Sequence, residues 1–170
     1  LSRAATLKRF WNLRKEIESF MINKQQNVAY LSDNDWLNDI AYLTDITQHL
    51  SDLNVKLQGK NQLVNKMFEH ICSFENKLQL FQTQLNKKTL THFPSLAVRK
   101  AEMQDLDCSK YAESVGRLCA EFTSRFSDFR KCETEFKLFS QPFGMKPEDS
   151  SDCYQMELID LQSDMDLRRA

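Results

Sequence analysis

The chain has 170 residues, of which 41% are hydrophobic and 28% are charged, and its net charge is −1. This balance is typical of a globular domain and argues against a protein whose whole surface binds polyanions. The three glycines and three prolines are too few for the many tight turns of a β-rich fold, so we expect a few long helices.

The first predicted helix covers residues 2–24, with Ser2 as its N-terminal cap. Its apolar residues recur at helical spacing, and a dense group of basic residues surrounds Trp11. The second helix begins at Ser32 or Asp33 and ends at Gly59, a glycine suited to the left-handed conformation that often follows a helix. A five-to-one excess of aspartate over lysine in residues 27–58 suggests that this helix attracts the basic first one.

The third predicted helix shows the clearest apolar periodicity in the chain. Its apolar residues alternate by three and four, as in the a and d positions of heptads: Val64, Met67, Ile71, Phe74, Leu78, Phe81 and Leu85. Two packing arrangements fit this stripe, a coiled coil with another chain or antiparallel packing against the other long helices of the same chain. We favour the second, because those helices carry matching stripes, and keep the seven residues as candidates for oligomerisation.

After a connection at residues 86–94, we expect a short helix from Ser95, as its cap, to about Met103. A single long helix follows from Ser109 to Phe139, with Gly116 as a weak point inside it. Residues 140–152 contain two prolines and a glycine and are predicted to form a linker. A short helix over 153–162 and a polar tail complete the chain.

Residues with the spacing of a catalytic or metal site are not found. Gly59-Lys60 lacks the upstream glycine, the following hydroxyl and the preceding strand of a phosphate-binding loop. The five cysteines are odd in number and are not clustered with the three histidines, which predicts reduced thiols and no metal. No apolar run approaches the ~20 residues of a membrane span. We therefore expect no cofactor, no small-molecule substrate and no membrane contact.

The basic group of the first helix is the main candidate for a functional surface. Lysine and arginine on a helix supply the sequence-independent phosphate contacts of DNA binding. The candidate residues are Arg3, Lys8, Arg9, Trp11, Arg14 and Lys15. The alternative is a solvated surface, or one that pairs with the aspartates of the second helix.

Five stretches of the chain resemble the domesticated hAT-type transposases of vertebrates. The longest is the run from DWLNDIAYLTDITQHL to ENKLQLFQTQL (35–85), followed by LTHFP (90–94). The opening LSRAATLKRFWNLRKEIESFM, the later EFKLFSQPF and the final MELIDLQSDMDL fit the same pattern. Among these proteins, the zinc finger BED domain-containing proteins are similar to this chain.

The resemblance implies that the chain is the helical insertion of a ribonuclease H-like core. That insertion helps to hold transposon-end DNA and contains none of the catalytic acids, so no catalytic residue is carried over. It also implies a nuclear protein with a DNA-associated or transcription-regulatory role. The alternative is a protein-interaction or oligomerisation scaffold without DNA contact.

Together these inferences predict an all-α, elongated bundle of about five to six helices, with long antiparallel helices and no sheet. The insertion-type domain is expected over residues 1–139, the linker over 140–152, and a short helix and tail that lead to a flanking domain over 153–170.

Overall fold

The computed structural model describes residues 2–59, 63–103 and 105–168. The regular secondary structure of these residues is helical, with no strand among them. Four long helices account for half of the chain: α1 (Arg3–Asn23), α2 (Asn34–Leu57), α3 (Val64–Asn86) and α5 (Ser109–Arg125). The shorter α-helices are α4 (Pro94–Glu102), α6 (Ser127–Lys131), α7 (Glu133–Ser140) and α8 (Gln155–Ser163). Single 3₁₀ turns occur at Ala29–Ser32, Pro142–Gly144, Pro147–Asp149 and Asp152–Tyr154.

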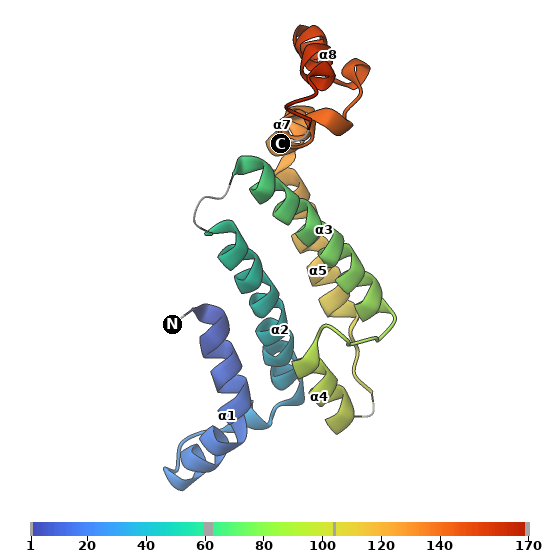
Figure 1. Cartoon of the computed structure of the whole chain (residues 1–170). Coiled ribbons are helices and arrows are strands. Elements are labelled where there is room, and N and C mark those ends of the chain that lie inside the picture. Colours follow the sequence, from blue (N-terminus) through green and yellow to red (C-terminus); the bar gives the residue numbers. More distant parts are fainter. Residues whose placement is uncertain (1, 60–62, 104, 169–170) are drawn as a thin grey trace.

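The molecule is elongated, with α1 and α4 toward one end and α7 and α8 at the other (Figure 1). The helices α3 and α5 lie side by side, and α2 separates this pair from α1. The prediction of an all-α fold is confirmed. The eight α-helices of the described residues exceed the five to six that we predicted, because the chain beyond residue 108 is broken more often than expected.

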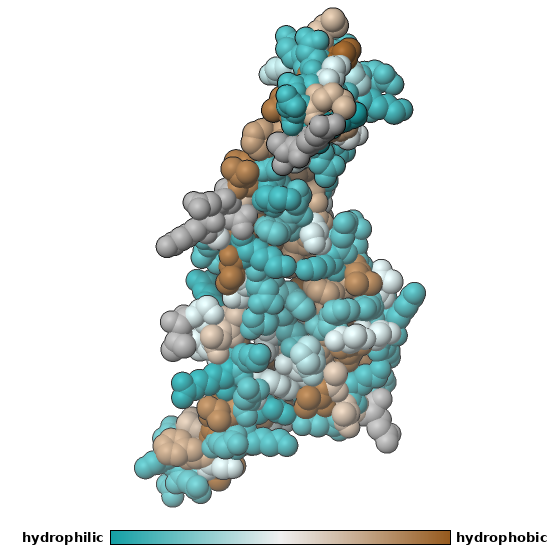
Figure 2. Space-filling view, viewed as in Figure 1, coloured by the Kyte–Doolittle hydropathy of each residue, from teal (hydrophilic) through white to brown (hydrophobic). Residues whose placement is uncertain are grey.

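The core lies where α2, α3, α4 and α5 meet. Phe93, just before α4, is fully buried, and its ring contacts those of Tyr42, His49 and Phe81 at centroid distances of 6.3, 5.9 and 5.4 Å. Leu78 of α3 and Val115 of α5 are also fully buried. Close contact of aromatic and branched side chains from four helices makes this one continuous cluster. On the face shown in Figure 2, the surface is mostly hydrophilic, with apolar residues scattered over it.

Local signals are visible at several helix ends, although not all in the predicted way. Ser2 accepts a hydrogen bond from the Ala5 amide at 3.2 Å, and Asp33 accepts from Asp35 and Trp36, so both predicted caps are confirmed. The helix α2 ends at Leu57 with Gln58 as its cap, one residue before Gly59. The left-handed conformation occurs instead at Gln25 and Lys88, which follow the ends of α1 and α3 with φ of 55° and 53°. Backbone bonds of the Schellman type close both ends.

The single helix that we predicted over 109–139 is interrupted twice. Phe126 and Cys132 depart from helical ψ, at 16° and 14°, and they separate α5, α6 and α7. The bends keep the chain against α3: Phe122 contacts Phe74, and Phe136 contacts Phe68 further along α3, at centroid distances of 5.3 and 5.4 Å. The apolar periodicity was therefore a correct guide to contact, but it did not reveal the breaks.

Candidate nucleic-acid interface

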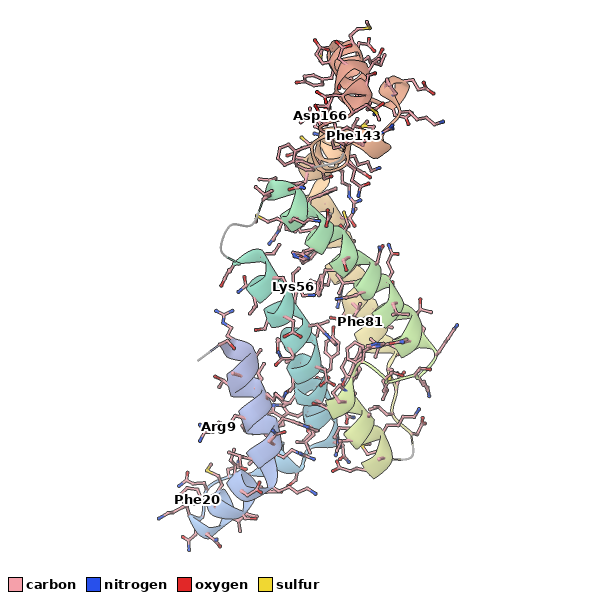
Figure 3. All side chains as sticks on the ribbon, viewed as in Figure 1. Arg9, Phe20, Lys56, Phe81, Phe143 and Asp166 are labelled. Atoms are coloured by element: carbon pink, nitrogen blue, oxygen red, sulfur yellow. The ribbon has the colours of Figure 1, made fainter. Side chains whose placement is uncertain are left out.

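The basic residues of α1 do not share one face. At 3.6 residues per turn, Lys8 and Lys15 fall on one stripe, and Arg3 and Arg14 fall on another. Arg9 points away from α2 (Figure 3). Between the two stripes lies Trp11, which is only 5% exposed and belongs to the core. The exposed cations of the predicted group are Arg3, Lys8, Arg9 and Lys15, which are spread around α1. Trp11 is buried and is not available for contact with a ligand.

Arg14 is bound within the fold. Its guanidinium lies 3.9 Å from the centre of the Trp11 ring and donates to the Trp11 carbonyl at 2.9 Å. It also forms an ion pair with Glu102 of α4 at 3.1 Å, which Lys15 approaches at 4.0 Å. Partial burial raises the pKa of Glu102, but the hydrogen bond from Arg99 and the charges of Arg14 and Arg99 outweigh it and lower the pKa overall. Arg14 therefore joins α1 to α4.

Buried Arg99 of α4 is the centre of this junction. It donates to the side-chain oxygens of Asn34 and Asn38, both at 2.8 Å, and pairs with Glu102 at 2.6 Å. With 5% of its surface exposed, Arg99 satisfies nearly its whole guanidinium inside the protein. The sequence did not identify this residue; the available signal was a pair of asparagines one turn apart at the start of α2.

A second polar contact joins α2 to α4. Asp45, which is buried, accepts hydrogen bonds from the amides of Ser95 and Leu96 at 2.9 to 3.1 Å. It thereby caps the first turn of α4 from a neighbouring helix. The prediction that Ser95 caps this helix was wrong, because Phe93 occupies the cap position and has no side-chain oxygen.

A groove of about 400 Å³ lies between α1, α2 and α4, and Lys8 and His49 are among its lining residues. Nε2 of His49 donates to the carbonyl of His92 at 2.8 Å, and Nδ1 of His92 lies 2.7 Å from the side-chain oxygen of Gln84. These bonds hold the two imidazoles in place. Lys8 also lines this groove, and its ammonium group forms no ion pair with an acid of the described residues.

The heptad residues of α3 are mainly internal. Five of the seven are buried in the core: Ile71, Phe74, Leu78, Phe81 and Leu85. Met67 is half-buried, and Val64, at the start of the helix, is 52% exposed. The stripe packs against α5 and α2 of the same chain, which is the arrangement that we favoured.

Within the described ranges, no three His, Cys, Asp or Glu side chains form a group that could hold a metal ion. Burial raises the pKa of the Cys72, Cys108 and Cys119 thiols, which disfavours the nucleophilic thiolate. Lys60 lies outside the described residues; Gly59 follows the end of a helix, not a strand. No helix in the described part of the chain is long and apolar enough to cross a bilayer.

These observations define an all-helical domain with a cationic first helix and a polar junction between α1, α2 and α4. Residues 1–86 match the FAM200/GTF2IRD2 helical domain, and the chain belongs to this FAM200/GTF2IRD2-like family, which is transposase-derived. The resemblance to domesticated transposases is thus confirmed at the level of the family.

Two relatives match nearly the whole chain. General transcription factor II-I repeat domain-containing protein 2 of Bos taurus is 43% identical over 162 residues, which cover 95% of this chain and 17% of the relative. The protein of the same name from Mus musculus is 41% identical over 169 residues, covering 99% of this chain and 18% of the relative. The chain therefore spans less than a fifth of the length of these relatives. No solved structure matches it.

Proposed function

We propose that this domain is a non-catalytic helical insertion of the hAT type that contacts DNA in a transposase-derived, transcription-regulatory nuclear protein. The observation that best supports the proposal is the exposure of Arg3, Lys8 and Arg9 without acidic partners. All three are exposed, and none forms an ion pair with an acidic side chain of the described residues. The relatives' names, which include a general transcription factor, support a nuclear role.

The position of Arg3 adds to this argument. It lies in the first turn of α1, where the helix dipole disfavours a positive charge and no acidic residue offsets it. A phosphate group at this end would be attracted both by the dipole and by the guanidinium. Arg3, Lys8 and Arg9 are therefore better placed to bind an external anion than to stabilise the fold.

The test is the salt dependence of binding to a DNA duplex, measured by fluorescence anisotropy. For the Arg3→Ala/Lys8→Ala/Arg9→Ala variant, we expect weaker binding and a salt slope reduced by about 0.9 for each lost phosphate contact. The matched control is Lys66→Ala/Lys131→Ala/Lys137→Ala, which removes the same charge from lysines that are paired with neighbouring acids. Equal losses in the two variants would contradict a specific role for α1.

A protein-interaction scaffold is the second candidate. Apolar side chains in and around α8 are exposed, among them Met156 at 68% and Ile159 at 43%. Such residues fit a protein contact better than the buried heptads of α3 do. A chain with no measurable DNA affinity that self-associates in sedimentation velocity would favour this candidate over the first.

A further inference from the structure

The helices α2 and α3 run in opposite directions (Figure 1). An open groove of about 400 Å³ is lined by residues of both helices. Two stripes of polar side chains line this groove. The stripe on α2 consists of His49, Asp52 and Lys56, and the stripe on α3 consists of His70, Ser73 and Lys77. Both sets have the spacing i, i+3, i+7, so each stripe follows one face of its helix. Figure 3 shows Lys56 at the gap between the two helices.

The two lysines of this groove are Lys56 and Lys77. Neither Lys56 nor Lys77 forms an ion pair with an acid of the described residues. The one carboxylate of the groove, Asp52, accepts a hydrogen bond from Gln48 at 2.8 Å and does not form an ion pair with Lys56 one turn away.

The helix dipole accounts for the position of only one of the two lysines. Lys56 lies in the last turn of α2, where the dipole favours a cation. Lys77 lies in the middle of α3, where no such effect operates. Two cations on facing helices repel each other across an open groove, and a bound anion would remove that repulsion. The hydroxyl of Ser73 and the ring of His70 offer further donors.

We propose that this α2–α3 groove binds phosphate groups of a nucleic-acid backbone, as a contact separate from α1. The inference rests on the proposed function for its choice of anion. The adjacency of two grooves supports that choice: His49 and Asp52 line both this groove and the one between α1, α2 and α4, where Lys8 lies. A backbone that contacts Lys8 can thus continue over α2 to Lys56 and Lys77.

The test compares two double variants of the full chain in DNA-duplex anisotropy over a series of salt concentrations. Lys56→Ala/Lys77→Ala should reduce the salt slope by about 2, because two phosphate contacts are lost. Lys87→Ala/Arg125→Ala is the control, since it removes the same charge from exposed residues outside the groove. An unchanged slope in the groove variant, or the same reduction in both variants, would overturn the inference.

The α1 triple variant, measured in parallel, separates this inference from the proposed function. A reduced salt slope only in the groove variant supports phosphate binding in the groove and contradicts the proposed DNA contact of α1. A reduced salt slope only in the α1 variant supports the proposed function and contradicts phosphate binding in the groove. Inorganic phosphate at constant ionic strength supplies the last comparison. If it displaces DNA more readily from the wild type than from the groove variant, phosphate and the DNA backbone share the groove. Phosphate that binds in the wild-type groove without displacing DNA would make the groove a small-anion site and overturn the backbone assignment.

Discussion

The two ends of the molecule differ in how their side chains are buried. The region from α1 to α5 contains the continuous core, whereas among residues 126–168 only Ser150 and Leu158 are buried. The second region is held mainly by local bonds, such as those from Gln162 to the carbonyls of Pro142 and Met145 at 2.6 and 2.7 Å. Stability is therefore concentrated in the first region, and the second depends on its attachment to α3.

That attachment consists of a ring contact and an ion pair. Phe136 contacts Phe68, and Arg130 pairs with Glu75, which is 4% exposed. The second carboxylate oxygen of Glu75 is buried without a hydrogen-bond partner in the described structure. A buried acid with an incomplete set of partners contributes less stability than a packed apolar side chain would.

The largest expected effect comes from matched phenylalanine substitutions in the two regions. Phe93→Ala removes a fully buried ring and should lower the free energy of unfolding by about 3–5 kcal/mol. Phe139→Ala removes a ring that is 69% exposed and should change it by less than about 0.5 kcal/mol. Urea denaturation measures both. Similar losses for the two variants would show that the described contrast in burial does not determine stability.

An intermediate effect is expected at the cap that joins α2 to α4. Asp45→Ala leaves the amides of Ser95 and Leu96 without their acceptor and should cost about 1–3 kcal/mol. Asp45→Asn retains one acceptor oxygen and serves as the control, with a smaller loss. A loss for Asp45→Ala no greater than that for Asp45→Asn in urea denaturation would rule out this contribution of the cap.

The comparison of the wild type with Asp45→Asn also predicts how stability depends on pH. Burial raises the pKa of Asp45 above its ordinary value of 3.8, although the hydrogen bonds from Ser95 and Leu96 oppose it. Stability from a raised pKa is present below the unfolded value and is lost as the pH rises through the folded one. The wild type should therefore gain stability relative to Asp45→Asn as the pH falls from neutral toward 3.8. A constant difference would mean that Asp45 does not titrate differently on folding.

The smallest effect on the main unfolding transition is expected from Leu158→Ala. Leu158 is 3% exposed but lies outside the core cluster, so its loss should destabilise α8 locally and leave the urea midpoint unchanged. Hydrogen exchange of the α8 amides should become faster, whereas Leu167→Ala, at a site 49% exposed, should leave it as in the wild type. A shift of the main transition would show that the two regions unfold together.

The sequence predicted those features that depend on neighbouring residues. Ser2 was predicted as one cap and Ser32 or Asp33 as the next, because a helix end requires a nearby acceptor, and the structure shows Ser2 and Asp33 in these positions. The buried stripe Ile71–Leu85 was identified because a buried face requires a period near 3.6. The candidate site was found only in part: Arg3, Lys8 and Arg9 are exposed as expected, whereas Trp11 is core and Arg14 is bound to Glu102.

Only the tertiary structure revealed the partners that lie far apart in the chain. Arg99 and Asn38 are 61 residues apart, and Asp45 and Ser95 are 50 apart, so no local pattern connects them. The breaks at Phe126 and Cys132 likewise arise where the chain bends along α3. The sequence by itself thus determined the all-helical class, the long helices up to residue 86 with their apolar faces, and the family. The arrangement of those helices decided which charges are used inside the fold and which, such as Lys56 and Lys77, remain exposed along an open groove.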